Sequence, residues 1–144
     1  MATPFLCQPI QHGADIVVHS TTKFLSGHGN AMGGAIVDSG TFNWAQNDKF
    51  PSLAQPEEAY HGLNFYESFG DLAYTTYGHA VGLRDLGPTM APMNAYLTIM
   101  GIETLALRME KHVANATIIA NFLNEQTRSH GSHTQVSKIQ STII

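Results

Sequence analysis

The pattern of hydrophobic and polar positions predicts two short strands near the start of the chain. Residues 15–19 include three consecutive β-branched residues, which suit a strand covered on both faces. Residues 32–38 form a second apolar run, whose glycines permit close approach of another backbone. Residues 39–68 are polar and weakly periodic and contain Pro51 and Pro56, so we expect an excursion outside the core.

Helices are predicted in the rest of the chain. Residues 71–86 have helical spacing and end before a Gly-Pro pair, and Pro92 is placed to open the next helix. The clearest helix covers residues 102–126, where apolar residues recur every three or four positions. Its apolar stripe consists of Leu105, Met109, Val113, Ala116, Ala120 and Leu123. Short strands followed by long helices indicate an α/β fold, here with an incomplete sheet.

Composition and charge exclude some classes of protein. The chain has 144 residues, of which 43% are hydrophobic and 12% charged, and a formal net charge of −4. The charged share is about half the usual one, as expected for a piece of a larger, mostly buried protein. A net negative charge without a basic stripe argues against nucleic-acid and acidic-membrane partners. A single cysteine, no long apolar run and no basic leader favour a cytoplasmic location.

The polar segment after the first strand carries the candidate chemistry, because Lys23 has the hydroxyl residues Ser20 and Thr22 three positions and one position before it. A neutral lysine amine can condense with an aldehyde, and burial or a nearby cation favours the neutral form. The two hydroxyls could then hold the phosphate of a phosphorylated cofactor outside the carboxyl end of the strand. The same residues also suit a solvated lysine beside turn-forming hydroxyls. Tight turning behind the site is expected at Gly27, Gly29, Gly33 and Gly34.

Other candidate groups favour structural roles. His12, His19 and His28 lack a familiar metal-ligand spacing, so no metal site is expected. Cys7 has no basic partner in the sequence and is interpreted as a small buried residue. Core packing is also the favoured role of four tyrosines, Tyr60, Tyr66, Tyr74 and Tyr77.

A longer stretch carries a family resemblance. Residues 15–29, DIVVHSTTKFLSGHG, closely resemble the pyridoxal 5'-phosphate (PLP) attachment signature of the cysteine and methionine metabolism enzymes. The matching positions are Asp15, Ile16, Ser20, Thr21, Thr22, Lys23, Phe24, Leu25, Gly27, His28 and Gly29. The stretches GGAIVDSGTFNW, FPSLAQPEEAYHGLNFYESFG and LRDLGPTMAPMNAYLTIMGIETLALRMEKH are similar to the O-acetylhomoserine sulfhydrylase branch of that family. The resemblance covers roughly residues 2–126.

The resemblance implies a fold and three site residues. Residues 1–126 would be part of the large PLP-binding domain of an aspartate-aminotransferase-like, fold type I enzyme. Residues 127–144 would be an irregular tail that could be a non-native continuation. Lys23 would hold PLP covalently and later act as the catalytic base that moves protons between the substrate's α-carbon and the cofactor. Ser20 and Thr22 would contact the phosphate.

The resemblance also implies a reaction. O-acetyl-L-homoserine and sulfide or methanethiol would give homocysteine or methionine plus acetate, in a homo-oligomeric enzyme. Two alternatives stay open: a lyase of the same family acting on cystathionine or methionine, and a non-catalytic remnant that only associates with a full-length subunit. Family members carry an upstream Asp-Asn-Thr and a C-terminal domain that cannot be matched here, so we expect a fragment with little or no activity alone.

Overall fold

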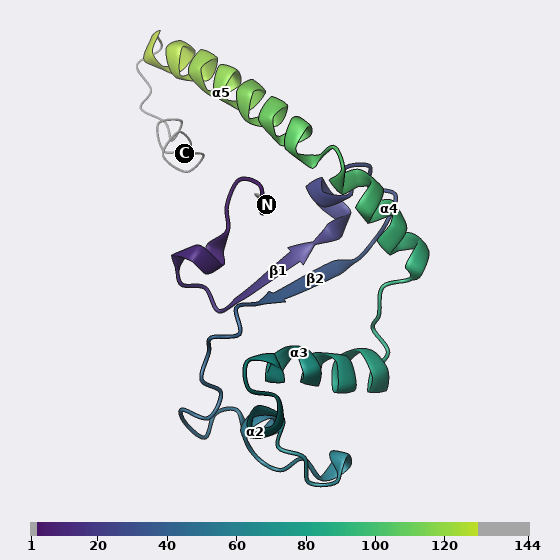
Figure 1. Cartoon of the computed structure of the whole chain (residues 1–144). Helices are drawn as coiled ribbons and strands as arrows, with labels where there is room; N and C mark the ends of the chain where they lie inside the picture. Colours follow the sequence, from purple (N-terminus) through teal and green to yellow (C-terminus); the bar gives the residue numbers. More distant parts are fainter. Residues whose placement is uncertain (1–2, 130–144) are drawn as a thin grey trace.

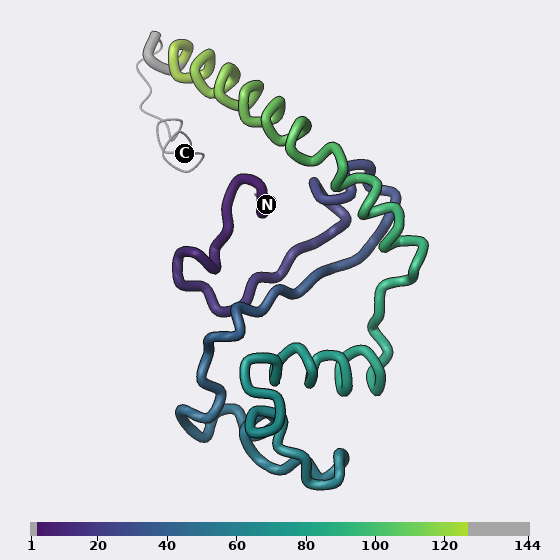
Figure 2. The backbone as a smooth tube through the Cα atoms, in the orientation of Figure 1, coloured from purple at the N-terminus to yellow at the C-terminus, as the bar shows by residue number. Residues whose placement is uncertain are grey.

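The computed structural model describes residues 3–129 and combines a two-stranded sheet with helices (Figure 1). The strands are β1 (Ile16–Ser20) and β2 (Gly34–Asp38). The helices are α1 (Pro51–Ala54), α2 (Phe65–Phe69), α3 (Ala73–Tyr77), α4 (Pro92–Ile102) and α5 (Leu105–Ser129). Further helical segments that are not α-helical are η1 (Pro9–His12), η2 (Thr21–Leu25), η3 (Glu58–Tyr60), η4 (Gly70–Leu72) and η5 (Gly78–Asp85). From the sheet the backbone passes through α1–α3 and returns as α4, which packs against η2 (Figure 2).

The two predicted strands are confirmed, and they pair antiparallel. Ile16 lies opposite Asp38, and Ser20 lies opposite Gly34. The prediction that the first strand is covered on both faces is wrong for the described residues, because Val18 is 63% exposed. The strands pack chiefly against each other, and residues 3–129 supply no third strand or helix that covers both faces of the pair.

An aromatic cluster occupies the segment that was predicted to be an excursion, so that prediction is wrong. Its buried members are Trp44, Leu53, Phe65 and Ala73. Trp44 stacks on Tyr74 with ring centroids 5.2 Å apart, and Phe65 meets Tyr77 edge-on at 5.1 Å. Large aromatic side chains from loops and from very short helices can bury much area without any regular spacing, so periodicity could not reveal them. Core packing of the tyrosines is confirmed for Tyr60, Tyr66, Tyr74 and Tyr77.

The predicted helices are confirmed with small shifts. The turns η4 and η5 extend α3 on both sides, so residues 70–85 are helical almost as predicted. Pro92 is the first residue of α4, where its missing N–H costs no hydrogen bond. In α5, Leu105, Met109 and Ala120 of the predicted stripe are buried, whereas Leu123 is 46% exposed. Among the described residues, no helix is long and apolar enough to cross a membrane.

Helix α5 runs past the predicted end at residue 126 and reaches Ser129. The first three residues of the predicted irregular tail, 127–129, are therefore helical. The remainder of that tail, residues 130–144, lies outside the described residues.

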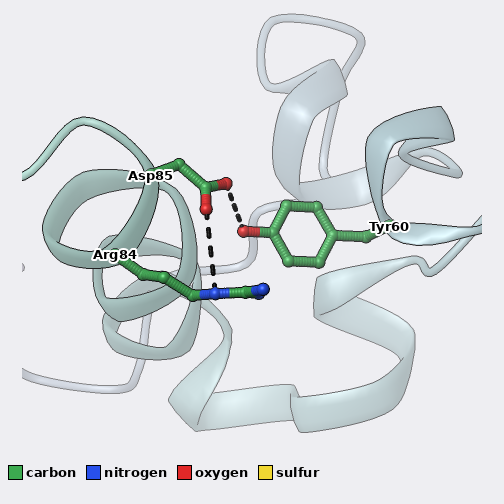
Figure 3. A network of polar contacts seen from close by, with 3 residues as sticks. All are labelled: Tyr60, Arg84 and Asp85. Atoms are coloured by element: carbon green, nitrogen blue, oxygen red, sulfur yellow. Dashed lines mark hydrogen bonds and ion pairs between the residues drawn. The ribbon is translucent and has the colours of Figure 1, made fainter.

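A polar contact joins η3 to η5 beside the aromatic cluster (Figure 3). The Tyr60 hydroxyl donates to Asp85 Oδ2 at 2.5 Å, and Arg84 Nε lies 3.9 Å from Asp85 Oδ1. The hydrogen bond to the carboxylate raises the pKa of Tyr60 above its usual value, because ionisation would remove the shared proton. The Arg84 side chain is 76% exposed, so solvent screens this ion pair and the contact holds η3 in place rather than forming a reactive site.

Cys7 is exposed, and its interpretation as a buried residue is wrong. Its neighbours Phe5 and Leu6 are also more than 40% exposed. The segment before β1 packs little against the rest of the described chain, so an apolar residue there does not become buried.

Candidate functional site

The candidate residues lie where β1 ends and η2 begins. Ser20 is the last residue of β1, and Thr22 and Lys23 belong to η2. Thr21 N donates to Gly33 O at 3.0 Å, which continues the pairing of the two strands into the turn. Gly33 N donates to Thr22 Oγ1 at 3.3 Å, so the Thr22 hydroxyl is fixed by the opposite strand.

The structure brings the three predicted residues to one edge of the sheet. Lys23 is exposed, and Ser20 and Thr22 are half-buried. The Lys23 backbone (φ −86°, ψ −128°) departs from helical geometry and divides η2 into two parts. Its carbonyl accepts a hydrogen bond from Gly27 N at 2.9 Å, which closes the turn behind it. Exposure leaves the Lys23 residue open to a small molecule and fits a solvated lysine equally well.

Glycines shape the loop that follows, as predicted for two of the four. Gly27 (φ +75°) and Gly29 (φ +66°) adopt left-handed backbone conformations that side chains disfavour. Gly34 instead lies in β2, and Gly33 is needed for space: a Cβ there would approach Thr21 Oγ1 to 2.8 Å. The backbone therefore turns tightly at Gly27 and Gly29, whereas at Gly33 it packs closely against Thr21.

The turn rests on the first half of α5. Phe24 and Leu25 pack with Leu105 and Met109, and the Phe24 ring lies 5.0 Å from the His112 ring. Arg108 reaches the same turn and donates from Nη1 to Phe24 O at 2.8 Å. A single helical arginine gives no sequence signal for a contact with a backbone carbonyl 84 residues away.

Helix α4 supports the turn from another side, which the sequence did not predict. Gly101 is buried, and a Cβ added to it would clash with the Ser26 carbonyl group. Asn94 Nδ2 donates to Met32 O at 3.0 Å and links α4 to the segment before β2. Figure 1 shows α4 beside the ends of both strands. A glycine inside an apolar helical run was the available signal, since it marks a close backbone approach.

The described histidines near the site do not form a cluster of possible metal ligands. His28 Nδ1 donates to Ser26 O at 2.7 Å, and His19 is half-buried in β1. Within residues 3–129 no three histidine, cysteine or acidic side chains are placed to hold a metal ion.

The donor set at the end of β1 fits a phosphorylated aldehyde. Because Thr22 Oγ1 accepts its hydrogen bond from Gly33 N, the hydroxyl hydrogen is available to donate to an anion. The Ser20 hydroxyl makes no hydrogen bond within the described chain and is equally available. Lys23, an exposed residue, adds a primary amine one position after Thr22 and three positions after Ser20. An amine for the aldehyde carbon and two hydroxyl donors for the phosphate are the groups such a ligand needs.

A protein-family model described as Cys/Met metabolism PLP-dependent enzyme matches residues 1–140. The chain belongs to this family. The match continues past residue 126, where the resemblance was expected to end.

Several curated relatives are members with named activities. An O-acetyl-L-homoserine sulfhydrylase from Leptospira meyeri is 48% identical over 136 residues, which cover 89% of this chain and 30% of that protein. A homocysteine/cysteine synthase from Saccharomyces cerevisiae is 49% identical over 122 residues, covering 84% of this chain and 28% of that protein. The chain is thus homologous to PLP-dependent O-acetylhomoserine sulfhydrylases and spans about 30% of the length of these relatives.

A solved structure agrees with the family assignment. The crystal structure of a protein from Campylobacter jejuni, assigned as an O-acetylhomoserine (thiol)-lyase, is 44% identical and superposes with a TM-score of 0.78. The similarity covers 85% of this chain and 30% of that chain. That structure contains N'-pyridoxyl-lysine-5'-monophosphate, a lysine that carries the cofactor covalently.

Proposed function

We propose that the protein of which this chain is part is a PLP-dependent O-acetyl-L-homoserine sulfhydrylase. O-acetyl-L-homoserine and hydrosulfide give homocysteine and acetate: a C–O bond breaks, a C–S bond forms, and acetate leaves with the bonding electrons. Methanethiol in place of sulfide gives methionine. The observation that carries the proposal is the signature stretch in a chain of this family, in which the exposed residue Lys23 directly follows Thr22 and lies three positions after Ser20, the last residue of β1.

The fold proposal follows from the same homology. Residues 1–126 form part of the large domain of an aspartate-aminotransferase-like enzyme, in which β1 and β2 belong to a wider sheet. The exposed faces of Val18, Ile36 and Val37 support this, because apolar strand residues are ordinarily covered in an α/β domain.

The candidate residues have two kinds of role in this proposal: covalent attachment with proton transfer, and phosphate binding. PLP supplies an electron sink for the substrate's α-carbon when it is bound. Lys23 Nζ holds the cofactor and afterwards accepts and returns the α-proton of the substrate. Ser20 and Thr22 donate hydrogen bonds to the phosphate and thereby orient the ring relative to Lys23. The hydrogen bond from Gly33 N keeps the Thr22 hydroxyl aimed in one direction.

The test is to incubate the purified protein with PLP, reduce with borohydride and map the modified peptide by mass spectrometry. We expect the modification on Lys23. The product of the complete gene is then assayed for sulfide-dependent acetate release from O-acetyl-L-homoserine, with homocysteine formed in equal amount. Modification spread over several surface lysines would contradict the assigned site. Cleavage of cystathionine or methionine without acetate release would favour the lyase alternative.

Ser20→Ala and Thr22→Val are each expected to weaken PLP binding by about tenfold to a hundredfold, the usual effect of losing one hydrogen bond to a charged group. The measurement is a PLP titration followed by absorbance. Thr21→Val is the matched control. Thr21 is 4% exposed and its Oγ1 has no hydrogen-bond partner within residues 3–129, so its replacement should leave affinity unchanged. An equal loss in all three variants would show that the turn, and not the two hydroxyls, governs binding.

A further inference from the structure

Arg108 makes an unusual set of contacts with the turn that bears Lys23. From the first half of α5, its Nη1 donates to Phe24 O at 2.8 Å and its Nη2 to Leu25 O at 3.5 Å. These are the two carbonyls that directly follow Lys23 in the chain. The backbone that leads out of Lys23 is therefore held by a side chain from a distant helix.

The same guanidinium contacts two further groups. Nη2 donates to Gly101 O at 2.7 Å near the end of α4, and Nε donates to Thr104 Oγ1 at 3.2 Å between α4 and α5. All three guanidinium nitrogens are thus used, and they join η2 to both long helices. Arg108 forms no ion pair within the described residues, so its charge serves carbonyl and hydroxyl acceptors alone.

The shape of arginine suits this position better than that of lysine. Its planar group presents donors in a rigid fork, whereas a lysine ammonium is a point donor on a flexible stem. Gly27 leaves the space for that fork, since a Cβ at residue 27 would lie 2.7 Å from Arg108 Cζ. The side chains of Phe24 and Leu25 also pack on α5, against Leu105 and Met109.

We propose that Arg108 is a positioning residue for Lys23, and this inference rests on the proposed function. By holding the Phe24 and Leu25 carbonyls, Arg108 fixes the backbone of η2 and limits where the Lys23 amine can lie relative to Ser20 and Thr22. It touches neither substrate nor cofactor in this role. Its loss leaves the amine chemically intact but less often in the geometry needed to receive the aldehyde.

The test compares Arg108→Met and Arg108→Lys with the control Lys111→Met, which removes an exposed charge from the same helix. Without cofactor, hydrogen exchange is measured at the amides of Ser26 and Gly27, which close η2 by donating to Thr21 O and Lys23 O. We expect exchange at both amides to rise about tenfold or more in the two Arg108 variants and to stay unchanged in the control. The lysine variant should fail to rescue, since it keeps the charge and loses the fork.

With PLP, the rate of borohydride-trappable attachment to Lys23 is expected to fall about tenfold in both Arg108 variants, because each lost hydrogen bond to a charged group is worth at least that factor. Arg108→Ala provides a further readout: millimolar guanidinium should restore the attachment rate. A role confined to global stability would not give this rescue, because guanidinium weakens folded proteins.

The outcomes separate the two proposals. No PLP on Lys23 in the unmodified product of the complete gene overturns the proposed function, while amide exchange still reports whether Arg108 fixes the turn. The positioning role is overturned if PLP attaches to Lys23 in the unmodified protein and the Arg108 variants match that protein both in attachment rate and in amide exchange at Ser26 and Gly27. A common fall in every variant, including Lys111→Met, overturns it as well.

Discussion

Replacing Lys23 by alanine is expected to abolish covalent attachment of PLP and to lower any O-acetylhomoserine-dependent acetate release by roughly 10²–10⁴-fold from the lost proton transfer alone. The expectation follows from position: Lys23 is the lysine that sits beside Ser20 and Thr22 at the end of β1. Borohydride reduction followed by mass spectrometry of the intact protein measures attachment, and the absorbance of the bound cofactor gives an independent readout.

Two comparison variants sharpen this result. Lys23→Arg keeps a positive charge but cannot supply a neutral amine, because the guanidinium stays protonated. It should therefore fail to attach PLP as completely as Lys23→Ala. Lys49→Ala removes an exposed lysine from the loop before α1 and should behave as the unmodified protein. Attachment that survives in Lys23→Ala and disappears in Lys49→Ala would place the cofactor elsewhere.

The candidate site could be predicted from sequence only as far as it is local. Ser20, Thr22 and Lys23 fall within four consecutive positions, so a single signature stretch predicted all three residues. Arg108 and Gly101 act on the same turn from α5 and α4, far along the chain. Helical periodicity reports which face of a helix is apolar and carries no information on which backbone a polar residue contacts.

The fold, too, could be predicted from the sequence only in part: the longer helices could be predicted and the aromatic cluster could not. Helix α5 was predictable because apolar side chains recur along it, and α4 because Pro92 starts it. The cluster around Trp44 and Phe65 was missed because its buried members come from one loop and from α1, α2 and α3, helices of four or five residues that are too short to show a periodic pattern. The predicted burial of the first strand was too high. The β-branched residues in 15–19 indicate that the segment forms a strand, but they do not indicate which other elements cover its faces.

Replacing Gly101 by alanine is expected to destabilise the protein by about 1–3 kcal/mol, the usual cost of overpacking a closely packed site. A Cβ at this position would meet the Ser26 backbone, with Ser26 C at 2.5 Å and Ser26 Cα at 2.7 Å. Neither the Ser26 backbone nor the Gly101 backbone can move away easily. Ser26 is fully buried and its N–H is bonded to Thr21 O, while Gly101 O accepts from Arg108. Denaturant unfolding followed by helical circular dichroism measures the change.

The matched control is Gly78→Ala, because Gly78 is also helical (φ −58°) but has nothing within 4 Å of the position of an added Cβ. Alanine there should stabilise the protein by roughly 0.5–1 kcal/mol through its better helix propensity. The same gain is available at Gly101, so the difference between the two variants measures the contact itself. If both variants were stabilised equally, α4 would not rest on the turn after β1, and the support for Lys23 from α4 and Arg108 would lose its structural basis.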